Sequence, residues 1–178
     1  KGKMVTVRTF DFGADRTMAD AYQGVQSSKL GLRGIRSSLR NLPQMAVQIC
    51  ALMRAATKGP LRVMFPMVTD VEDWDAAMEV VERCRQRLRE RGVSFNEDTS
   101  FGVMLSVPSA CLTAEEFVAH GCGFFVIGTN DLTQYTHAVD RELAPAEHYY
   151  RPASKAMKKL IRMVMGAAKQ GDVPVTIC

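Results

Sequence analysis

Gly123-Phe124-Phe125-Val126-Ile127 is the stretch of sequence that decides the fold, because this apolar run leads directly into the polar residues Gly128-Thr129-Asn130-Asp131. A short, continuous apolar run is typical of a β-strand that is buried on both faces of a sheet. Similar runs occupy residues 4–10, 61–67, 101–107 and 173–177. We therefore predict five strands, which need helices between them to cover their faces.

Amphipathic stretches separate the apolar runs. The clearest spans residues 71–91, where apolar side chains recur at three- and four-residue spacings and Gly92 follows, so we predict a long helix there. Further helices are predicted to begin near Pro43 and to span residues 154–170, and residues 113–116 have the form of a capping box that opens a shorter helix. This alternation predicts a parallel sheet with right-handed crossovers. Both an open doubly wound sheet and part of a barrel fit the pattern.

The composition is that of an ordinary globular protein. The chain has 178 residues, of which 47% are hydrophobic and 24% are charged. Such a length supports a domain with a real core, but a complete (β/α)8 barrel typically needs about 200 residues or more. We therefore expect one domain over residues 1–178 that is too short to be a complete barrel.

The net charge and the cysteines limit the partners and the compartment. Lys and Arg number 23 against 19 Asp and Glu, a net charge of +4 that suits anionic small molecules and is too weak to imply nucleic acid. The five cysteines lack zinc-like spacing and indicate free thiols in a reducing compartment. No apolar run approaches the roughly 18 residues of a membrane span, and residues 1–8 do not form a signal peptide. We expect a cytoplasmic protein with no membrane or nucleic-acid partner.

Charged and polar side chains follow several of the predicted strands. Arg8 and Asp11 come at the end of the first strand, while Asn130, Asp131 and later Arg141 follow the fourth. Arginines that converge at the carboxyl edge of a sheet favour a phosphorylated or carboxylated ligand, because guanidinium binds such groups in a bidentate fork. Asp131 beside Asn130 offers oxygen ligands suited to Mg²⁺, although an isolated Asn-Asp pair more often forms a turn or a helix cap.

Several segments resemble the phosphoenolpyruvate (PEP)-utilising enzymes. Residues 127–135 (Ile-Gly-Thr-Asn-Asp-Leu-Thr-Gln-Tyr) and 138–141 (Ala-Val-Asp-Arg) are similar to the signature of that family. Residues 7–15, 30–36 and 62–67 resemble further segments of its PEP–protein phosphotransferase branch (enzyme I), in the same order along the chain. The resemblance covers nearly the whole chain and implies an α/β fold, a partial (β/α)8 (TIM) barrel with about five of the eight strand–helix units.

The resemblance also implies roles for individual residues and partners. Those that would bind the phosphate of PEP are Arg8, Arg33, Asn130 and Arg141. Asp131 would hold Mg²⁺ between the phosphate and the carboxylate of the substrate, and Cys178 would be the acid–base that protonates C3 of enolpyruvate to give pyruvate. In this family the phosphoryl group passes to a histidine on a separate domain and on to a phosphocarrier protein. Catalysis then depends mainly on positioning and on charge.

One departure from the family pattern concerns the metal. The third strand of the family ends in Val-Glu-Thr-Pro, whereas this chain reads Leu105-Ser106-Val107-Pro108, so the second metal carboxylate is absent. A serine hydroxyl is a weak, neutral ligand, and we expect the affinity for Mg²⁺ to fall. This leaves open a non-catalytic binding or regulatory module, and an enzyme of the pyruvate phosphate dikinase or PEP synthase type, as alternatives.

A second departure concerns the extent of the chain. It corresponds to the third to seventh strands of the family barrel, and none of His120, His137 and His148 lies in a recognisable phosphohistidine context. We therefore do not expect turnover by this polypeptide alone, and its status as an enzyme stays open. An incomplete barrel exposes strand edges and apolar faces, so we predict a homo-oligomer.

Overall fold

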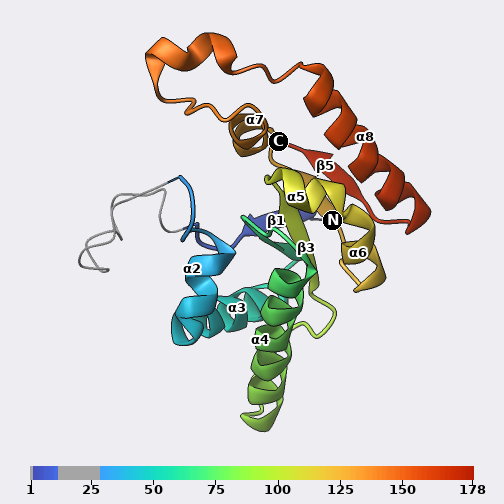
Figure 1. Cartoon of the computed structure of the whole chain (residues 1–178). Coiled ribbons are helices and arrows are strands. Elements are labelled where there is room, and N and C mark those ends of the chain that lie inside the picture. The colour runs from blue at the N-terminus through green and yellow to red at the C-terminus, as the bar shows by residue number, and fades with distance from the viewer. Residues whose placement is uncertain (1, 12–28) are drawn as a thin grey trace. The chain divides into compact units, whose positions relative to one another are not determined.

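A computed structural model describes residues 2–11 and 29–178 (Figure 1). The strands are β1 (Val5–Arg8), β2 (Leu61–Phe65), β3 (Ser100–Leu105), β4 (Phe125–Ile127) and β5 (Val175–Ile177). The helices are α2 (Ile35–Arg40), α3 (Leu42–Ala55), α4 (Val71–Glu90), α5 (Pro108–Leu112), α6 (Ala114–Ala119), α7 (Thr129–Thr136), the 3-10 helix η1 (Ala144–Tyr149) and α8 (Lys155–Gln170). The five predicted strands are confirmed. Gly13 and Asp15, which belong to the segment 7–15 quoted above, lie outside the described residues.

The five strands are parallel, and their order in the sheet follows the chain, β1-β2-β3-β4-β5. Val5 of β1 lies opposite Leu61 of β2, Leu105 of β3 opposite Ile127 of β4, and Ile127 opposite Ile177 of β5. A doubly wound sheet reverses its strand order at a switch point, whereas a barrel adds each strand beside the previous one. The topology is therefore that of a partial (β/α)8 barrel, and this prediction is confirmed.

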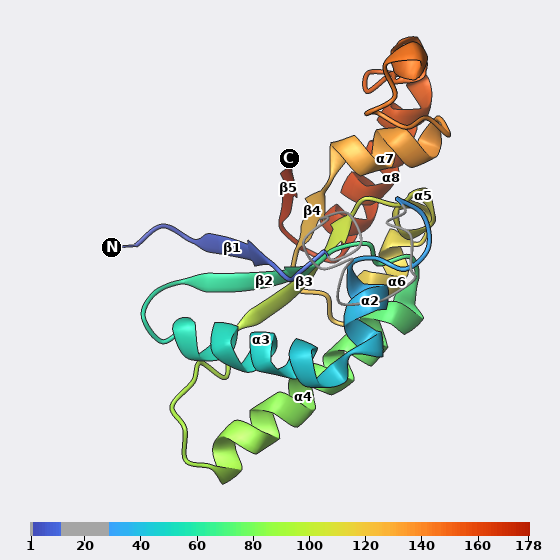
Figure 2. The ribbon, with the colours of Figure 1, turned by 90° about the vertical axis from the view of Figure 1, so that its left-hand side faces the viewer.

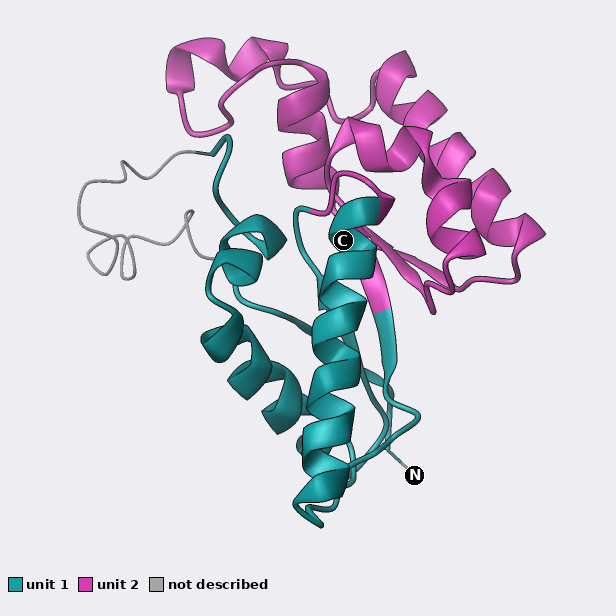
Figure 3. Cartoon of the chain, turned by 60° about the horizontal axis from the view of Figure 1, so that its bottom comes forward, with its two compact units in different colours: residues 1–67, 72–101 teal, residues 68–71, 102–178 magenta. Residues whose placement is uncertain are grey.

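The described residues divide into two compact units (Figure 3). Unit 1 comprises residues 1–67 and 72–101, and unit 2 comprises residues 68–71 and 102–178. Unit 1 therefore holds β1, β2, α2, α3 and nearly all of α4, while unit 2 holds β4, β5 and α5 to α8. β3 begins in unit 1 and ends in unit 2.

Three buried aromatic side chains form the centre of unit 1. The ring of Phe65, at the end of β2, lies 6.1 Å from that of Trp74 on α4 and 5.8 Å from that of Phe101 at the start of β3. Helices α3 and α4 lie side by side, on the same side of β1 and β2 (Figure 2), and Cys84 Sγ of α4 lies 3.6 Å from the Ala46 carbonyl oxygen of α3. The buried face of α4 recurs every three or four residues, as predicted.

The core of unit 2 forms around α8, which packs against α5, α6 and α7. Ser154 caps this helix, since its Oγ accepts a hydrogen bond from Met157 N at 3.2 Å. The shorter helix predicted at residues 113–116 is present as α6, but the predicted capping box is wrong: the Thr113 hydroxyl instead donates to the Ser109 carbonyl oxygen at 3.2 Å. Among the described residues, no helix has both the length and the apolar character needed to cross a bilayer.

Candidate functional site

Arg33 lies in a buried ion pair in unit 1. Its Nε donates to Asp11 Oδ1 at 3.1 Å and its Nη2 to Asp11 Oδ2 at 2.6 Å, and both side chains are 4% exposed. Arg8, at the end of β1 with its side chain 44% exposed, places Nη1 3.6 Å from the same Asp11 Oδ2. The structure thus brings together the two arginines that were predicted to bind phosphate from this part of the chain. Asp11 neutralises one of their two charges, a role that the sequence analysis missed.

A glycine holds the Arg33 segment against the end of β2. Ile35 N donates to the Pro66 carbonyl oxygen at 3.0 Å. Gly34 has a φ of 57°, and a Cβ at this position would lie 2.7 Å from Met67 Cβ and 2.9 Å from the Pro66 carbonyl oxygen. Both the left-handed backbone and the close approach exclude a side chain. Gly34 therefore positions Arg33.

In unit 2, the polar segment that follows β4 forms the first turn of α7. Asn130 and Asp131 lie in this turn, where the helix dipole favours negative charge. Asp131 Oδ1 is 3.4 Å from Arg141 Nη1, and the two side chains are 13% and 37% exposed. The structure thus brings together the predicted metal ligand and a predicted phosphate ligand. The pair leaves part of the guanidinium open to solvent, so an anionic ligand can reach it.

Gln134 positions Arg141 from inside α7. Its buried Oε1 accepts a hydrogen bond from Arg141 N at 3.2 Å, and its carbonyl oxygen accepts one from Val139 N at 3.0 Å. Ala138, with a φ of 51°, turns the chain between α7 and Arg141. The sequence analysis missed this role, although Gln134 lies three residues after Asp131 on the same helix, which places the two side chains on neighbouring positions.

Asn130 has a partner that the sequence analysis also missed. The Tyr150 hydroxyl lies 3.2 Å from Asn130 Oδ1 and 3.4 Å from the Asn130 carbonyl oxygen. Because the amide oxygen accepts this bond, the amide nitrogen is the atom suited to donate to an anion. Tyr150 follows η1, a segment without apolar periodicity, so no pattern in the sequence pointed to it.

Cys178 lies beside the start of α7. Its N donates to the Ile127 carbonyl oxygen at 3.0 Å, and its own carbonyl oxygen accepts from Thr129 N at 3.1 Å and from Thr129 Oγ1 at 2.8 Å. The thiol donates to the Ile127 carbonyl oxygen at 3.7 Å, and the residue is exposed. The predicted acid–base is therefore held by the same strand end and helix start that carry Asn130 and Asp131.

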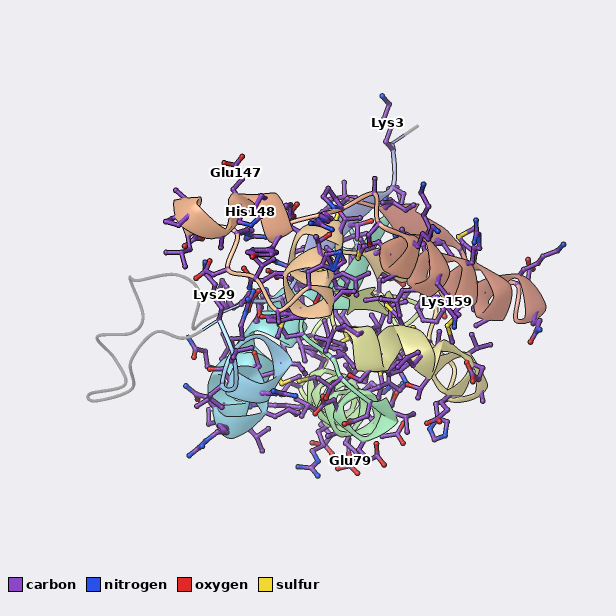
Figure 4. The ribbon with its side chains drawn as sticks, turned by 45° about the horizontal axis from the view of Figure 1, so that its top comes forward. Lys3, Lys29, Glu79, Glu147, His148 and Lys159 are labelled. Carbon is purple, nitrogen blue, oxygen red and sulfur yellow. The ribbon has the colours of Figure 1, made fainter. Side chains whose placement is uncertain are left out.

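The remaining cysteines and the histidines have other surroundings than Cys178. Cys84, Cys111 and Cys122 are buried, while Cys50 is half-buried. Burial raises the pKa of the Cys111 thiol, and likewise the pKa of the Cys122 thiol, to about 12. The histidines occupy helix ends: His120 and His137 are the C-caps of α6 and α7, and His148 (Figure 4) lies in the last turn of η1, with its ring 3.8 Å from that of Tyr149.

The side chains that the structure describes do not fit a magnesium ion. Ser106 is 1% exposed and lies against Gly128, since a Cβ on Gly128 would lie 3.2 Å from Ser106 Cβ. Within residues 2–11 and 29–178, no group of three His, Cys, Asp or Glu side chains could hold a metal ion. Asp131, the predicted ligand, is paired with a guanidinium, and a neighbouring cation opposes the binding of Mg²⁺.

Comparisons with known proteins identify the family to which the chain is similar. The profile of a family described as "PEP-utilising enzyme, PEP-binding domain" matches residues 1–178. The phosphoenolpyruvate-protein phosphotransferases of Haemophilus influenzae, Priestia megaterium and Cupriavidus necator are 38%, 36% and 34% identical to the chain over 94%, 100% and 99% of its length. The matched regions are 29%, 31% and 30% of those proteins, so the chain spans about 30% of the length of the curated relatives it matches.

Proposed function

The chain belongs to the PEP-utilising enzymes, within their PEP-binding domain, and we propose that it is the PEP-binding part of a phosphotransferase. The parent protein would move the phosphoryl group of PEP to a protein histidine and release pyruvate. The observation that carries this proposal is the half-open pair of Asp131 and Arg141 at the end of β4, the segment in which the family signature lies. The curated relatives named above, all phosphoenolpyruvate-protein phosphotransferases, favour this branch over the dikinase and synthase branches.

We assign the binding of the phosphate to the four predicted ligands. Arg141 presents a partly exposed guanidinium, and the amide nitrogen of Asn130, whose oxygen accepts from Tyr150, would donate to the ligand. Arg8 and Arg33 add the remaining positive charge, with Asp11 keeping Arg33 in a fixed orientation. Guanidinium groups suit both the phosphate and the carboxylate of PEP, because they offer paired donors to two oxygens.

In the proposed reaction, a histidine on a separate domain attacks the phosphorus atom of PEP. The bond between phosphorus and the enol oxygen breaks as the nitrogen–phosphorus bond forms, which leaves the enolate of pyruvate. Arginine guanidinium groups stabilise the negative charge on the phosphoryl and enolate oxygens. The Cys178 thiol then gives its proton to C3, which yields pyruvate and a thiolate. The exposed position of Cys178 beside Thr129 supports this role.

Calorimetric titration with PEP tests the binding role. We expect the full chain to bind PEP and the substitution Arg141→Met to weaken binding by about tenfold or more, since hydrogen bonds between charged groups are the strong ones. Arg162→Met is the matched control, because Arg162 is an exposed arginine of α8 in the same unit. Absence of binding at millimolar PEP, or equal losses in the two variants, contradicts the proposal.

Exchange of the methyl protons of pyruvate in D2O tests the role of Cys178 without a phosphoryl acceptor. The thiolate would take a proton from C3 and return a deuteron, and NMR follows the loss of the methyl signal. We expect Cys178→Ser to abolish the exchange and Cys50→Ser to leave it unchanged. If the chain binds PEP but the methyl protons exchange no faster than in buffer, the second candidate function, a non-catalytic binding module, is supported instead. Ser106 favours this candidate because it lacks the carboxylate of the family motif.

The partners and the surroundings follow from the same proposal. We propose that the parent protein works in the cytoplasm with a phosphohistidine domain and a phosphocarrier protein, that the two units fold as one domain, and that the chain self-associates. Light scattering of the purified chain checks the last point, and a monomer at all concentrations contradicts it.

A further inference from the structure

We propose that this chain binds PEP without Mg²⁺, because the guanidinium of Arg141 occupies the place beside Asp131 that a metal ion would need. This inference rests on the proposed function and deepens it. It concerns unit 2 alone, where Asp131, Arg141, Ser106 and Gln134 all lie.

The charges beside Asp131 favour a guanidinium over a metal ion. Asp131 and Arg141, whose Oδ1 and Nη1 atoms are 3.4 Å apart, together carry no net charge. A divalent cation placed on Asp131 would add two positive charges next to Arg141, and charges a few ångströms apart near a protein surface interact strongly. An anionic ligand meets the opposite situation, since it gains a partner in Arg141 without displacing a metal.

Ser106 lacks the negative charge of a second carboxylate, which would help to compensate the charge of a metal ion. Ser106 has a neutral hydroxyl in place of a carboxylate. Its Cβ lies close to Gly128, and Gly128 is two residues before Asn130 in the sequence. Mg²⁺ binds in proteins through one or two carboxylates together with oxygens of the substrate, and it gives up its water reluctantly. With Ser106 at this position, the metal would depend on a single carboxylate that Arg141 already holds.

The backbone at Arg141 is held by Gln134 of α7. The Arg141 backbone N–H is held at 3.2 Å by Oε1 of Gln134, which is buried in α7. The turn that leads to Arg141 is fixed as well, because Val139 N donates to the Gln134 carbonyl oxygen at 3.0 Å. Because the backbone is held and the guanidinium pairs with Asp131, Arg141 can serve as a counter-charge for phosphate or carboxylate at the start of α7.

Titration of the full chain with PEP in EDTA and in excess Mg²⁺ tests this inference. We expect the two dissociation constants to agree within about twofold, because no metal takes part in binding. Binding that is about tenfold tighter in Mg²⁺ overturns the inference and leaves the proposed function standing. Absence of binding in both buffers, in contrast, removes the proposed function.

A titration with Mn²⁺ alone, followed by electron paramagnetic resonance, tests the metal separately from PEP. We expect no binding of Mn²⁺ below millimolar concentrations, because Arg141 already pairs with Asp131. Micromolar binding of Mn²⁺ that Asp131→Asn abolishes overturns it.

The variant Asp131→Asn tests whether the Asp131 carboxylate competes with the ligand for Arg141 or helps the ligand to bind. If Asp131 competes with the ligand for Arg141, its loss should tighten the binding of PEP in EDTA by about threefold, the size of a partly exposed charge pair. Weaker binding of PEP by this variant in EDTA overturns the inference. The matched control is Glu147→Gln, which removes one negative charge from the exposed outer side of η1 in the same unit (Figure 4).

The variants Ser106→Glu and Ser106→Gln test the missing carboxylate, since they differ in charge and little in size. We expect only Ser106→Glu to bind PEP about tenfold more tightly in Mg²⁺ than in EDTA. A folded Ser106→Glu variant without this dependence overturns the assignment of the defect to position 106. If this variant fails to fold, as circular dichroism would show, the wild-type and Asp131→Asn titrations still decide the inference.

Discussion

Arg33 and Arg141 each pair with an aspartate, but the two pairs differ in burial and in geometry. Arg33 makes two hydrogen bonds to Asp11 inside unit 1, with both side chains 4% exposed. Arg141 Nη1 lies 3.4 Å from Asp131 Oδ1 in unit 2, and the Arg141 side chain is 37% exposed. A buried, bidentate pair is costly to break, whereas an open contact exchanges readily with a ligand. The same two residue types therefore form a buried, bidentate pair in one unit and a partly open pair in the other, where we propose that the ligand meets Arg141.

The largest expected effect comes from breaking the buried pair. Asp11→Ala removes the carboxylate that accepts two hydrogen bonds from the buried Arg33, and we expect the free energy of unfolding to fall by about 3–5 kcal/mol. Asp131→Ala, which opens the half-exposed pair, should cost about 1 kcal/mol or less. Urea denaturation of both variants measures the difference. Equal losses of stability would show that burial does not distinguish the two pairs.

The next effect concerns the glycine that positions Arg33. Gly34→Ala combines a φ of 57° with a Cβ only 2.7 Å from Met67 Cβ, and we expect it to lower the free energy of unfolding by about 2–4 kcal/mol. Gly31→Ala is the matched control, since Gly31 has a φ of 84° but nothing within 4 Å of the added Cβ. This control should cost about 1 kcal/mol, the price of the backbone alone. Thermal or urea unfolding gives both values, and a difference near zero would refute the close approach at Gly34.

A smaller effect is expected at the residue that positions Arg141. Gln134→Ala removes the acceptor of the Arg141 N–H, and we expect a loss of about 1 kcal/mol in stability together with a severalfold weaker binding of PEP. Gln86→Ala, which removes an exposed amide paired with Glu90 on α4, should change neither by more than a few tenths of a kcal/mol. Calorimetry and urea denaturation check both variants. Unchanged PEP binding in Gln134→Ala would show that Arg141 needs no such anchor.

The smallest expected effect is the contribution of the buried thiols to the pH dependence of the free energy of unfolding. Burial raises the pKa of Cys111 and of Cys122 to about 12, whereas a cysteine of the unfolded chain has a pKa of about 8.5. Above that pH the unfolded chain binds fewer protons than the folded one, so the free energy of unfolding should fall as the pH rises from about 8.5 toward 12. Below about pH 8 these thiols contribute no pH dependence.

Urea denaturation between pH 8 and pH 10 measures this slope. We expect Cys111→Ala to reduce the slope relative to the wild type and Cys178→Ser, at the exposed thiol, to preserve it. A thiol-specific disulfide reagent at pH 8 gives a second readout, since Cys178 should react much faster than Cys111 or Cys122. Equal reaction rates would contradict the burial of the latter two.

Sequence patterns predicted the elements well and their ends less well. The apolar runs predicted each strand because buried strands require apolar side chains on both faces. Residues 66 and 67 were included in the second strand but follow β2, since Met67 adopts a φ of 60° that no strand allows. Thr113 was predicted to cap α6, but its hydroxyl donates to Ser109 because a local carbonyl competes for it.

The site was predicted in part. The signature after β4 led to Asn130, Asp131 and Arg141, and the structure brings the last two into contact. The pairing of Arg33 with Asp11 spans 22 residues, and no spacing rule encodes a contact at that separation. Tyr150 likewise reaches Asn130 from a segment whose path depends on tertiary packing. Motifs therefore locate the groups that we propose to meet a ligand, while the groups that hold them in place follow from the fold.

Thr129 donates two hydrogen bonds to the Cys178 carbonyl oxygen, one from its backbone N–H and one from its hydroxyl. These bonds have a thermodynamic consequence. Cys178 and the first turn of α7 share one set of hydrogen bonds, so we expect reversible modification of the thiol and the binding of an anion at that turn to be linked equilibria. Whatever factor an anion imposes on the affinity for a reversible thiol ligand, that ligand imposes on the affinity for the anion. Cys178 can therefore report on the occupancy of the neighbouring helix start without any turnover.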